Sequence, residues 1–357
     1  IRYVNSGKYI GGIVGLALST VEGCNVSGVI ESTGTEIGGI TGLSQAPIKG
    51  CSFKGEIYGG MDMGGIVGYT SSSVDNCHAN AAINLTTYIP HGTSTHASGG
   101  IVGAAYGKAS AKVSISNCYF AGSISDQMQV NQLGGVCGAM WYGSITNCFN
   151  TGRLTCYAGA GTDGNSPLAG GICGYSGDVV IDNCYNAGAI NAPNSNFSGG
   201  IMGYTAGNSS SVSAITNCYN SGMVNTNSQT STCVIIGNVW EKIKTFTYSN
   251  NYYDVQTAGS EYPCDGGLPT SELISGNPIN GLSSDKWVYE KGYYPRLKGM
   301  SDNNEAFLSA SAMMLSGEET IKKIRKPFTV STANGIKWGF MNSNGDIVPS
   351  CDAMTVD

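Results

Sequence analysis

Charged side chains are scarce in this sequence of 357 residues, and basic ones are the scarcer kind. There are 18 Lys and Arg against 24 Asp and Glu, so charged residues make up 12% of the chain and its net charge is −6. A surface that binds nucleic acid needs clustered basic side chains to neutralise phosphates. The composition therefore argues against nucleic acid as a partner. A weakly acidic surface rich in Tyr, Ser and Asn instead suits an extracellular protein.

Long apolar runs and metal-binding patterns are also missing. No run approaches the roughly 20 residues of a membrane helix, so we expect this segment not to span a membrane. The 13 cysteines include no C-x-x-C pair, and the three histidines are scattered. We therefore expect neither a metal nor a cofactor. A G-x-G-x-x-G match at 159–164 runs into Asn165-Ser166-Pro167 instead of a helix, which favours a flexible turn over a nucleotide site.

Glycine, by contrast, is abundant: its 53 residues are about twice the ordinary share. The phrase Gly-Gly-Ile-Val-Gly at 64–68 recurs in seven clear copies, whose first glycines lie 27, 26, 35, 35, 36 and 29 residues apart. A worn eighth copy occupies 233–237. Self-similarity at this spacing indicates a repeat architecture. The first glycines of the clear copies are Gly11, Gly38, Gly64, Gly99, Gly134, Gly170 and Gly199.

A second phrase, centred on a cysteine, follows each clear copy. Ile or Val stands three residues before this cysteine, an aliphatic residue stands six after it, and Asn or Gly stands directly before it. Short apolar segments separated by Gly and Asn predict strands joined by turns. The cysteines are Cys24, Cys51, Cys77, Cys118, Cys148, Cys184 and Cys218.

These phrases predict an all-β fold, a parallel β-helix or solenoid of about eight coils. Parallel pairing at about 4.8 Å per coil stacks each residue on its equivalent in the next coil. The recurrent cysteines then act as small buried hydrophobes, so we expect a column of free thiols. Cys137, Cys173 and Cys233 suggest a second column. The longer repeats carry surface insertions, at 84–98, 107–113, 156–169 and 207–213.

The two phrases resemble the GLUG motif of large bacterial surface proteins and of some immunoglobulin A peptidases outside their catalytic parts. The closest copy is GGICGYSGDVVIDNCYNAGAI at 170–190, and the resemblance covers about residues 1–300. It implies a right-handed parallel β-helix on an exported bacterial protein, at the cell surface or secreted. The motif brings no catalytic residues. Because the chain starts at Ile1 without Met, we expect it to be part of a longer surface protein.

Two domains are expected, 1–300 and 301–357. Within the first, about 240–300 forms a C-terminal cap that covers the last coil. Here Thr270 or Ser271 caps a short helix, and Trp287 and the segment 293–295 pack on the final coil. The second domain has predicted strands at 327–330 and 335–340 and a turn at 342–346. It faintly resembles the start of a bacterial immunoglobulin-like domain with Trp338 as core tryptophan, which predicts an incomplete sandwich or a smaller β-module.

No catalytic constellation emerges from the coils. The best candidate is the outward column two residues before each cysteine, in which Glu22 and Asp75 lie two coils, or about 10 Å, apart. An inverting glycosidase needs about 6.5–9.5 Å, and Lys49 lies between the two carboxylates, where it would neutralise them. We expect a solvated ion-pair ladder and no enzyme. The column is Glu22, Lys49, Asp75, Ser116, Thr146, Asp182 and Thr216.

Three functions remain open on the sequence. The favoured one is a non-enzymatic scaffold or adhesin-like interaction module that binds a host or cell-surface glycan or protein. The others are a glycan-binding module and a polysaccharide lyase or hydrolase, the latter by analogy of fold alone. Outward aromatic rings following the two phrases are candidate ligand contacts, although they also suit a shielding or corner-filling role. They are Tyr69, Tyr175 and Tyr204 after the glycine phrase, and Tyr119, Phe149, Tyr185 and Tyr219 after the cysteine.

Overall fold

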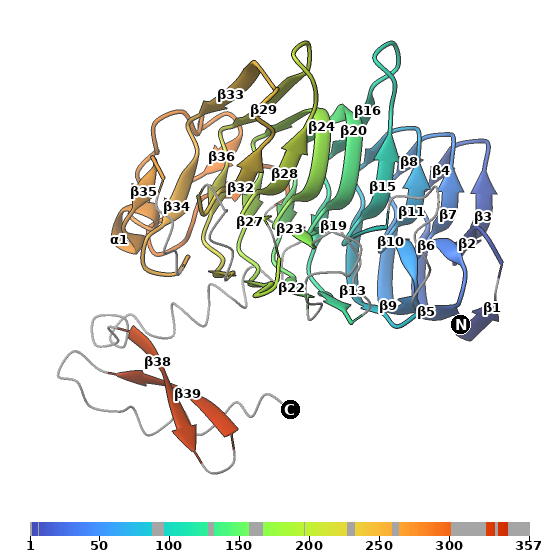
Figure 1. The fold of residues 1–357 in the computed structure, drawn as a ribbon, viewed down its shortest axis with the longest axis horizontal. Helices are drawn as coiled ribbons and strands as arrows, with labels where there is room; N and C mark the ends of the chain where they lie inside the picture. Colours follow the sequence, from blue (N-terminus) through green and yellow to red (C-terminus); the bar gives the residue numbers. More distant parts are fainter. Residues whose placement is uncertain are drawn as a thin grey trace.

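The computed structural model is nearly all β, in long parallel sheets that run the length of the repeats (Figure 1). The only helix in the described part of the chain is α1 (Thr270–Leu273). The structure describes residues 2–5, 7–87, 96–127, 132–156, 167–195, 197–226, 233–258, 264–300, 326–332 and 335–341. The G-x-G-x-x-G match at 159–164 lies outside these residues.

Sheet 1 has seven strands, and each ends on the first glycine of a repeat phrase. All its pairings are parallel, and that glycine pairs with its equivalent from Gly11 through to Gly199. The register is therefore kept through repeats of unequal length, as the sequence predicts. The strands are β2 (Ile10–Gly11), β6 (Thr35–Gly38), β10 (Met61–Gly64), β14 (Ala97–Gly99), β19 (Gln132–Gly134), β23 (Leu168–Gly170) and β27 (Phe197–Gly199).

Sheet 2 follows the glycine phrase and has 14 strands. In most repeats it takes one strand after the glycines and another before the cysteine, and in two repeats these fuse into ten-residue strands, β20 and β24. The first set is β3 (Val14–Ala17), β7 (Thr41–Ser44), β11 (Val67–Thr70), β15 (Val102–Tyr106), β20 (Cys137–Thr146), β24 (Cys173–Asp182), β28 (Met202–Ala206) and β32 (Ile236–Val239). The second set is β4 (Val21–Glu22), β8 (Ile48–Lys49), β12 (Val74–Asp75), β16 (Val113–Ser116), β29 (Val212–Thr216) and β33 (Thr245–Ser249).

Sheet 3 follows the cysteine phrase and also has 14 parallel strands. Early repeats contribute one long strand, whereas later ones contribute two short strands. They are β1 (Arg2–Asn5), β5 (Asn25–Ser32), β9 (Ser52–Gly59), β13 (His78–Leu85), β17 (Tyr119–Phe120), β18 (Ser123–Asp126), β21 (Phe149–Asn150), β22 (Arg153–Cys156), β25 (Tyr185–Asn186), β26 (Ile190–Asn191), β30 (Tyr219–Asn220), β31 (Val224–Asn225), β34 (Tyr252–Asp254) and β35 (Gly267–Leu268).

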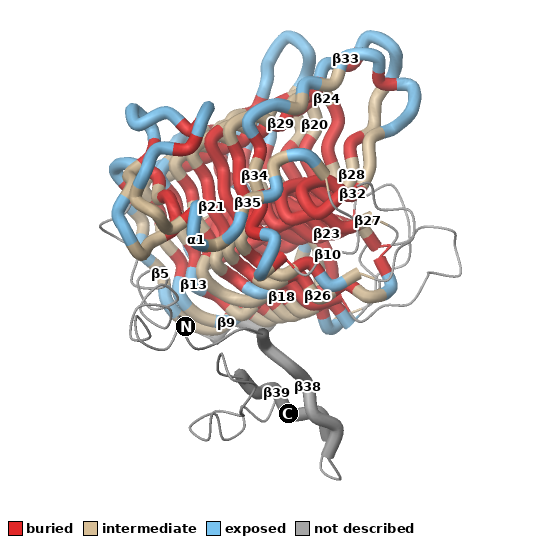
Figure 2. Tube along the Cα trace, turned by 90° about the vertical axis from the view of Figure 1, so that its left-hand side faces the viewer, coloured by how far each residue is buried: buried red, intermediate tan, exposed pale blue. Residues whose placement is uncertain are grey.

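The core lies between the three sheets and continues from one repeat to the next (Figure 2). The aliphatic column before the cysteine is fully buried from Ile48 to Ile215, and the cysteines from Cys51 to Cys218 are buried free thiols. In this column, each thiol from Cys51 to Cys218 donates to the carbonyl two residues earlier; from Cys77, for example, the distance to Asp75 O is 3.2 Å. The predicted column of free thiols is confirmed. Cys24, in the first repeat, is only half-buried.

Backbone geometry explains why Asn or Gly precedes each cysteine. From the third repeat on, the Asn at this position has a φ between 49° and 55°, and Gly23 and Gly50 have φ values of 67° and 57°. This left-handed region is open to Gly and tolerated by Asn, but it is strained for most residues. The double glycine has a different cause: a Cβ on Gly65 would lie 2.2 Å from Gly100 O. Equivalent backbones approach too closely there for any side chain.

The C-terminal cap folds back along a flank of the repeats. Trp287 and Leu273 are buried in one cluster with Phe149, Tyr185 and Tyr219, which come from three successive repeats. The cap therefore packs across several repeats, whereas the sequence predicts that it packs on the final coil. The predicted helix is present as α1, but its N-cap is Pro269, with no side-chain cap bond. The cap also contains the antiparallel pair β36 (Trp287–Val288) and β37 (Arg296–Leu297).

In the second predicted domain the structure describes one antiparallel hairpin. It consists of β38 (Lys326–Thr332) and β39 (Gly335–Met341), with Thr332 paired to Gly335. Both strands were expected from the sequence. The predicted turn at 342–346 and the side chain of Trp338 lie outside the described residues.

Candidate functional site

The outward polar column has the predicted register but not the predicted ion pairs. Glu22 pairs with Lys49, and Lys49 with Asp75, and the column continues as predicted to Thr216. The Asp75 carboxylate accepts from Ser116 Oγ at 2.7 Å and from Asn117 Nδ2 at 2.8 Å. Among the described side chains, no Lys or Arg lies in ion-pair contact with it. Neutral donors from the next repeat satisfy this carboxylate, although Lys49 is its direct register partner in the preceding repeat.

Asp182 repeats this arrangement three repeats later. Its Oδ1 accepts from Thr216 Oγ1 and Asn217 Nδ2, both at 2.7 Å. The two carboxylates are thus each tied into a separate local network. They do not form the close pair that general acid–base cleavage of a glycosidic bond requires.

The aromatic residues that follow the cysteines form a stacked ladder beneath the cap. The rings of Tyr119, Phe149, Tyr185 and Tyr219 are parallel, with centroids 4.8 to 5.1 Å apart. Phe149, Tyr185 and Tyr219 are buried, and the Tyr219 hydroxyl donates to Pro295 O at 2.7 Å. The protein itself covers these three rings, which removes them from the candidate ligand contacts. Tyr119 remains half-buried and stacks on His78 at 4.9 Å.

The aromatic residues that follow the glycine phrase remain partly exposed on sheet 2. Tyr69, Tyr175 and Tyr204 occupy one column, in which Tyr175 and Tyr204 pair directly. The column holds alanine in the repeats between Tyr69 and Tyr175, at Ala104 and Ala139.

The neighbouring column, two residues further along each strand, supplies the missing rings. Tyr106 and Trp141 pair there, beside the two alanines. Tyr69 stacks on Tyr106 with centroids 5.6 Å apart, and Trp141 lies 5.6 Å from Tyr175. A large residue in one column thus accompanies a small one in the other, and the rings form a continuous strip. Tyr106 and Trp141 were missed as candidates because they belong to neither repeat phrase.

Gly177 gives Trp141 its place in this strip. It pairs with Trp141 of the preceding repeat, and an added Cβ at Gly177 would lie 2.2 Å from Trp141 Cζ3. The indole therefore lies directly against the backbone of the neighbouring strand. A side chain at position 177 would force the indole to move.

Trp240 completes the strip at its C-terminal end. It follows β32, is 39% exposed, and meets Tyr204 edge-on with centroids 6.4 Å apart. Its backbone N–H donates to Thr205 O at 2.9 Å, which fixes its position on the sheet. Lys242 places its ammonium group 5.6 Å from the centre of the Trp240 ring. Trp240 was also missed from the sequence, because it lies in the stretch where the repeat pattern ends.

A hollow of about 450 Å³ lies over this end of the strip. That volume is within the usual range for small-molecule sites. Its lining combines five aromatic residues with Asp178, Asn208 and Ser211 and with two small residues at the end of β28, Ala206 and Gly207. The aromatic lining residues are Trp141, Tyr142, Tyr175, Tyr204 and Trp240.

Asp178 fixes the polar wall of the hollow. Its Oδ2 accepts from Ser211 Oγ at 2.9 Å and its Oδ1 from Val212 N at 3.0 Å. Ser211 Oγ in turn accepts from Asn208 N at 2.9 Å. These bonds tie the insertion after β28 to the preceding repeat. Burial raises the pKa of both Tyr175 and Tyr204. The negative charge of Glu241 raises the pKa of Tyr204 further.

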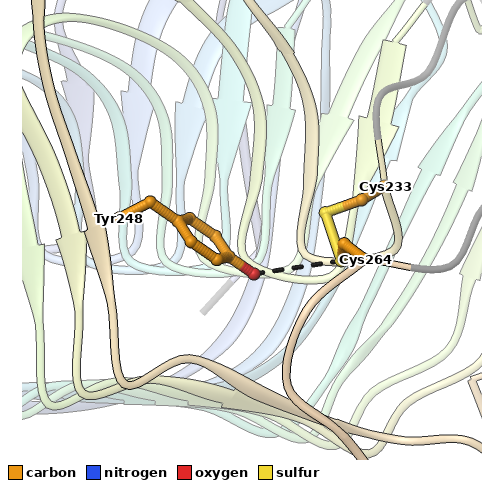
Figure 3. Close-up of a disulfide and its surroundings, with 3 residues drawn as sticks. All are labelled: Cys233, Tyr248 and Cys264. Carbon is orange, nitrogen blue, oxygen red and sulfur yellow. Dashed lines mark hydrogen bonds between the residues drawn. A yellow bond between two sulfur atoms is a disulfide. The ribbon is translucent and has the colours of Figure 1, made fainter.

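A disulfide between Cys233 and Cys264 joins the eighth repeat to the cap (Figure 3). The Tyr248 hydroxyl points toward Cys264, at 3.9 Å from its sulfur. The sequence suggested Cys233 as a member of a second thiol column with Cys137 and Cys173. This prediction is wrong, because Ile236 occupies that column in the eighth repeat and Cys233 is disulfide-bonded. Its partner Cys264 belongs to no repeat, so no periodic signal identifies the pair.

Within the described residues, no group of three or more His, Cys, Asp and Glu could hold a metal ion. No described helix is long and apolar enough to cross a membrane. No protein-family model matches this sequence, and a search of curated proteins finds no significant relative. The resemblance to the GLUG motif therefore rests on the repeat phrases themselves.

Proposed function

We propose that residues 1–300 form a right-handed parallel β-helix of about eight coils built from GLUG repeats, acting as a non-enzymatic interaction scaffold. Three observations support this architecture: every pairing in the three sheets is parallel, equivalent residues pair through the repeats, and insertions leave the register intact. Crossover connections between parallel strands are nearly always right-handed. Eight coils at about 4.8 Å give a rigid block about 38 Å long.

The observation that carries the non-enzymatic proposal is the state of the outward carboxylates. Asp75 and Asp182 are bound by hydroxyl and amide donors of adjacent repeats and do not face one another. Such networks hold a surface in place, whereas polysaccharide cleavage needs a carboxylate pair or a calcium site with several carboxylates. We therefore favour scaffold over lyase or hydrolase.

We place this module outside a bacterial cell, on its surface or secreted. The Cys233–Cys264 disulfide supports this, since structural disulfides persist in oxidising compartments. The thiols of the cysteine column from Cys51 to Cys218 are buried and so protected from oxidation. The hairpin β38–β39 fits a second, β-rich module after residue 300, for which we retain the immunoglobulin-like proposal. We also retain the proposal that the chain is part of a longer surface protein.

A product assay tests the non-enzymatic proposal. The full chain is incubated with neutral and uronate-containing polysaccharides, with and without calcium. We expect no new reducing ends and no unsaturated products. Turnover that disappears in Asp75→Asn or Asp182→Asn would replace the scaffold proposal by the polysaccharide-active alternative. Glycan binding without turnover is the second candidate function, and the aromatic strip on sheet 2 favours it.

A further inference from the structure

We infer that the hollow on sheet 2 binds a neutral oligosaccharide that lies across successive repeats. The inference rests on the proposed interaction function and gives it a site and a ligand class. Four rings come one per repeat from repeats five to eight: Trp141, Tyr175, Tyr204 and Trp240. Their centroids are 5.6, 5.9 and 6.4 Å apart in that order.

The spacing of the rings favours a chain-like ligand. Three steps of parallel strand pairing extend over about 14 Å. Consecutive pyranose units repeat at about the spacing of adjacent strands, so a short glycan placed along the repeats meets one ring per sugar. The C–H groups of a pyranose face carry partial positive charge, and the faces of aromatic rings are negative. Adjacent rings are inclined to one another by 56°, 31° and 82°, so sugar faces can stack on individual rings and the chain must turn between them.

The polar wall suits sugar hydroxyl groups. An ionised carboxylate has about four acceptor positions, and Asp178 uses two of them in the bonds to Ser211 and Val212. Asp178 is only partly buried, so the remaining positions can accept from ligand hydroxyls. Polar groups fix orientation and apolar rings provide contact area, which is the usual division in small-molecule sites.

The charges around the hollow favour a neutral glycan over an acidic one. Asp178 lines the hollow and Glu241 lies close enough to Tyr204 to raise its pKa. Lys242, the one described cation in contact with the strip, already lies over Trp240. Two carboxylates against one ammonium group repel a polyuronate.

The site is also pre-organised, which lowers the entropy lost on binding. Gly177 allows Trp141 to lie against the neighbouring strand, and the bonds of Asp178 hold the 207–211 turn. Ring positions are thus set by the sheet and by its register rather than by a free loop.

Calorimetric titration of the full chain tests the inference. The probes are four neutral tetrasaccharides, cellotetraose, xylotetraose, mannotetraose and maltotetraose, with glucose, a tetrauronate and choline chloride for comparison. We expect at least one neutral tetrasaccharide to bind at least tenfold more tightly than glucose and the tetrauronate. Choline tests whether the rings and Asp178 select a quaternary ammonium ion instead.

Matched variants locate the binding. Trp240→Ala and Tyr175→Ala should each weaken it at least tenfold, whereas Tyr69→Ala should leave it within about twofold. Tyr69 occupies the same column as Tyr175 but lies outside the hollow. Because Trp240 is exposed, its variant should fold normally, and circular dichroism checks all three.

Three outcomes overturn the inference. The first is that no tetrasaccharide binds up to about 10 mM, a range that covers weak millimolar affinities. The second is that Tyr175→Ala and Tyr69→Ala weaken binding equally, and the third is that choline binds while no tetrasaccharide does. None of these outcomes contradicts the scaffold proposal. Only product formation in the separate cleavage assay overturns that proposal.

Discussion

The indole N–H of Trp287 donates to Asn183 Oδ1 at 3.1 Å, across 104 residues of sequence. Asn183 belongs to the left-handed corner before a cysteine, and its neighbours in that column bond to one another, as Asn147 does to Asn117 at 3.3 Å. At Asn183 the side-chain oxygen Oδ1 accepts from Trp287 of the cap instead of from a neighbouring Asn. This bond ties the cap to the sixth repeat, beside the buried cluster that the cap forms with Phe149, Tyr185 and Tyr219.

Replacing Trp287 by Phe should therefore lower the free energy of unfolding by about 1–3 kcal/mol. Most of the buried ring is kept, but Asn183 Oδ1 loses its donor in a nearly buried place. Urea unfolding followed by circular dichroism measures the change. Trp240→Phe is the matched control and should shift stability by less than about 0.5 kcal/mol, because Trp240 is exposed. Equal shifts for the two would show that the bond does not hold the cap.

Replacing Ile145 by Asp should be severely destabilising. Ile145 is fully buried between Ile115 and Ile181, which pair with it in the adjacent repeats. A carboxylate there has neither a partner nor water, so we expect a loss of more than about 4 kcal/mol or failure to fold. The yield of soluble protein and its melting temperature report this. Ser209→Asp, on the exposed 207–211 turn, should melt within a few degrees of the unchanged protein; a comparable loss there would contradict the assignment of inside and outside.

Asp62 should make stability depend on pH. Its pKa is raised from 3.8 to about 7, chiefly by burial and also by Glu36, against the lowering effects of the Ala97 N–H and of Lys8. The folded state then holds a proton between about pH 4 and 7 that the unfolded state has lost, so the contribution of Asp62 to stability falls as pH rises through this window. At about 1.4 kcal/mol per pKa unit, the loss is at most about 4 kcal/mol.

Comparison with Asp62→Asn isolates this effect from that of the other carboxylates. Asn tolerates the φ of 49° at this position. Urea unfolding at pH 4.5 and 7.5 should show the variant gaining stability relative to the unchanged protein as pH rises. A stability difference that is the same at both pH values would show that Asp62 is already ionised at pH 4.5.

The cysteines should separate into two chemical classes. Burial raises the pKa of Cys118, Cys148 and Cys184, and the thiolate is the reactive form. Iodoacetamide should leave these thiols unmodified in the native protein and label them after denaturation without reductant. Cys233 and Cys264 should become labelled only after reduction. Peptide mapping by mass spectrometry gives the answer, and oxidised column cysteines in the denatured, unreduced sample would contradict the free-thiol column.

Periodicity decides which of these features the sequence could predict. Ile145, Cys148 and the first glycines recur in fixed phrases, so their columns and register follow from the spacing alone. The cap does not recur, and its placement depends on contacts between repeat and non-repeat residues, such as Trp287 to Asn183 and Tyr219 to Pro295. The Cys233–Cys264 disulfide likewise joins a repeat residue to one outside the repeats, so periodicity does not predict it.

The candidate site lies between these two cases. Tyr175 and Tyr204 follow the glycine phrase and were predicted as candidates, whereas Trp141 and Trp240 stand outside both phrases. A signal for Trp141 exists in the sequence, since Ala139 interrupts the tyrosine column two residues before it. In the column that follows the cysteines, Tyr185 and Tyr219 are buried by the cap and so are not ligand contacts. The sequence does not reveal this, because the residues that cover them come some 70 to 100 positions later.

Ala104 and Ala139 stand two residues before Tyr106 and Trp141 on the same strands, and this arrangement has a consequence for how such a surface changes in evolution. Each outward position is a point on a grid, defined by its repeat and by its place within the repeat. Exchanging a ring and an alanine between adjacent columns moves one contact sideways by two residues while the core and the register stay as they are. The binding face can therefore diversify by small local substitutions, and duplication of a whole repeat lengthens the grid by one row.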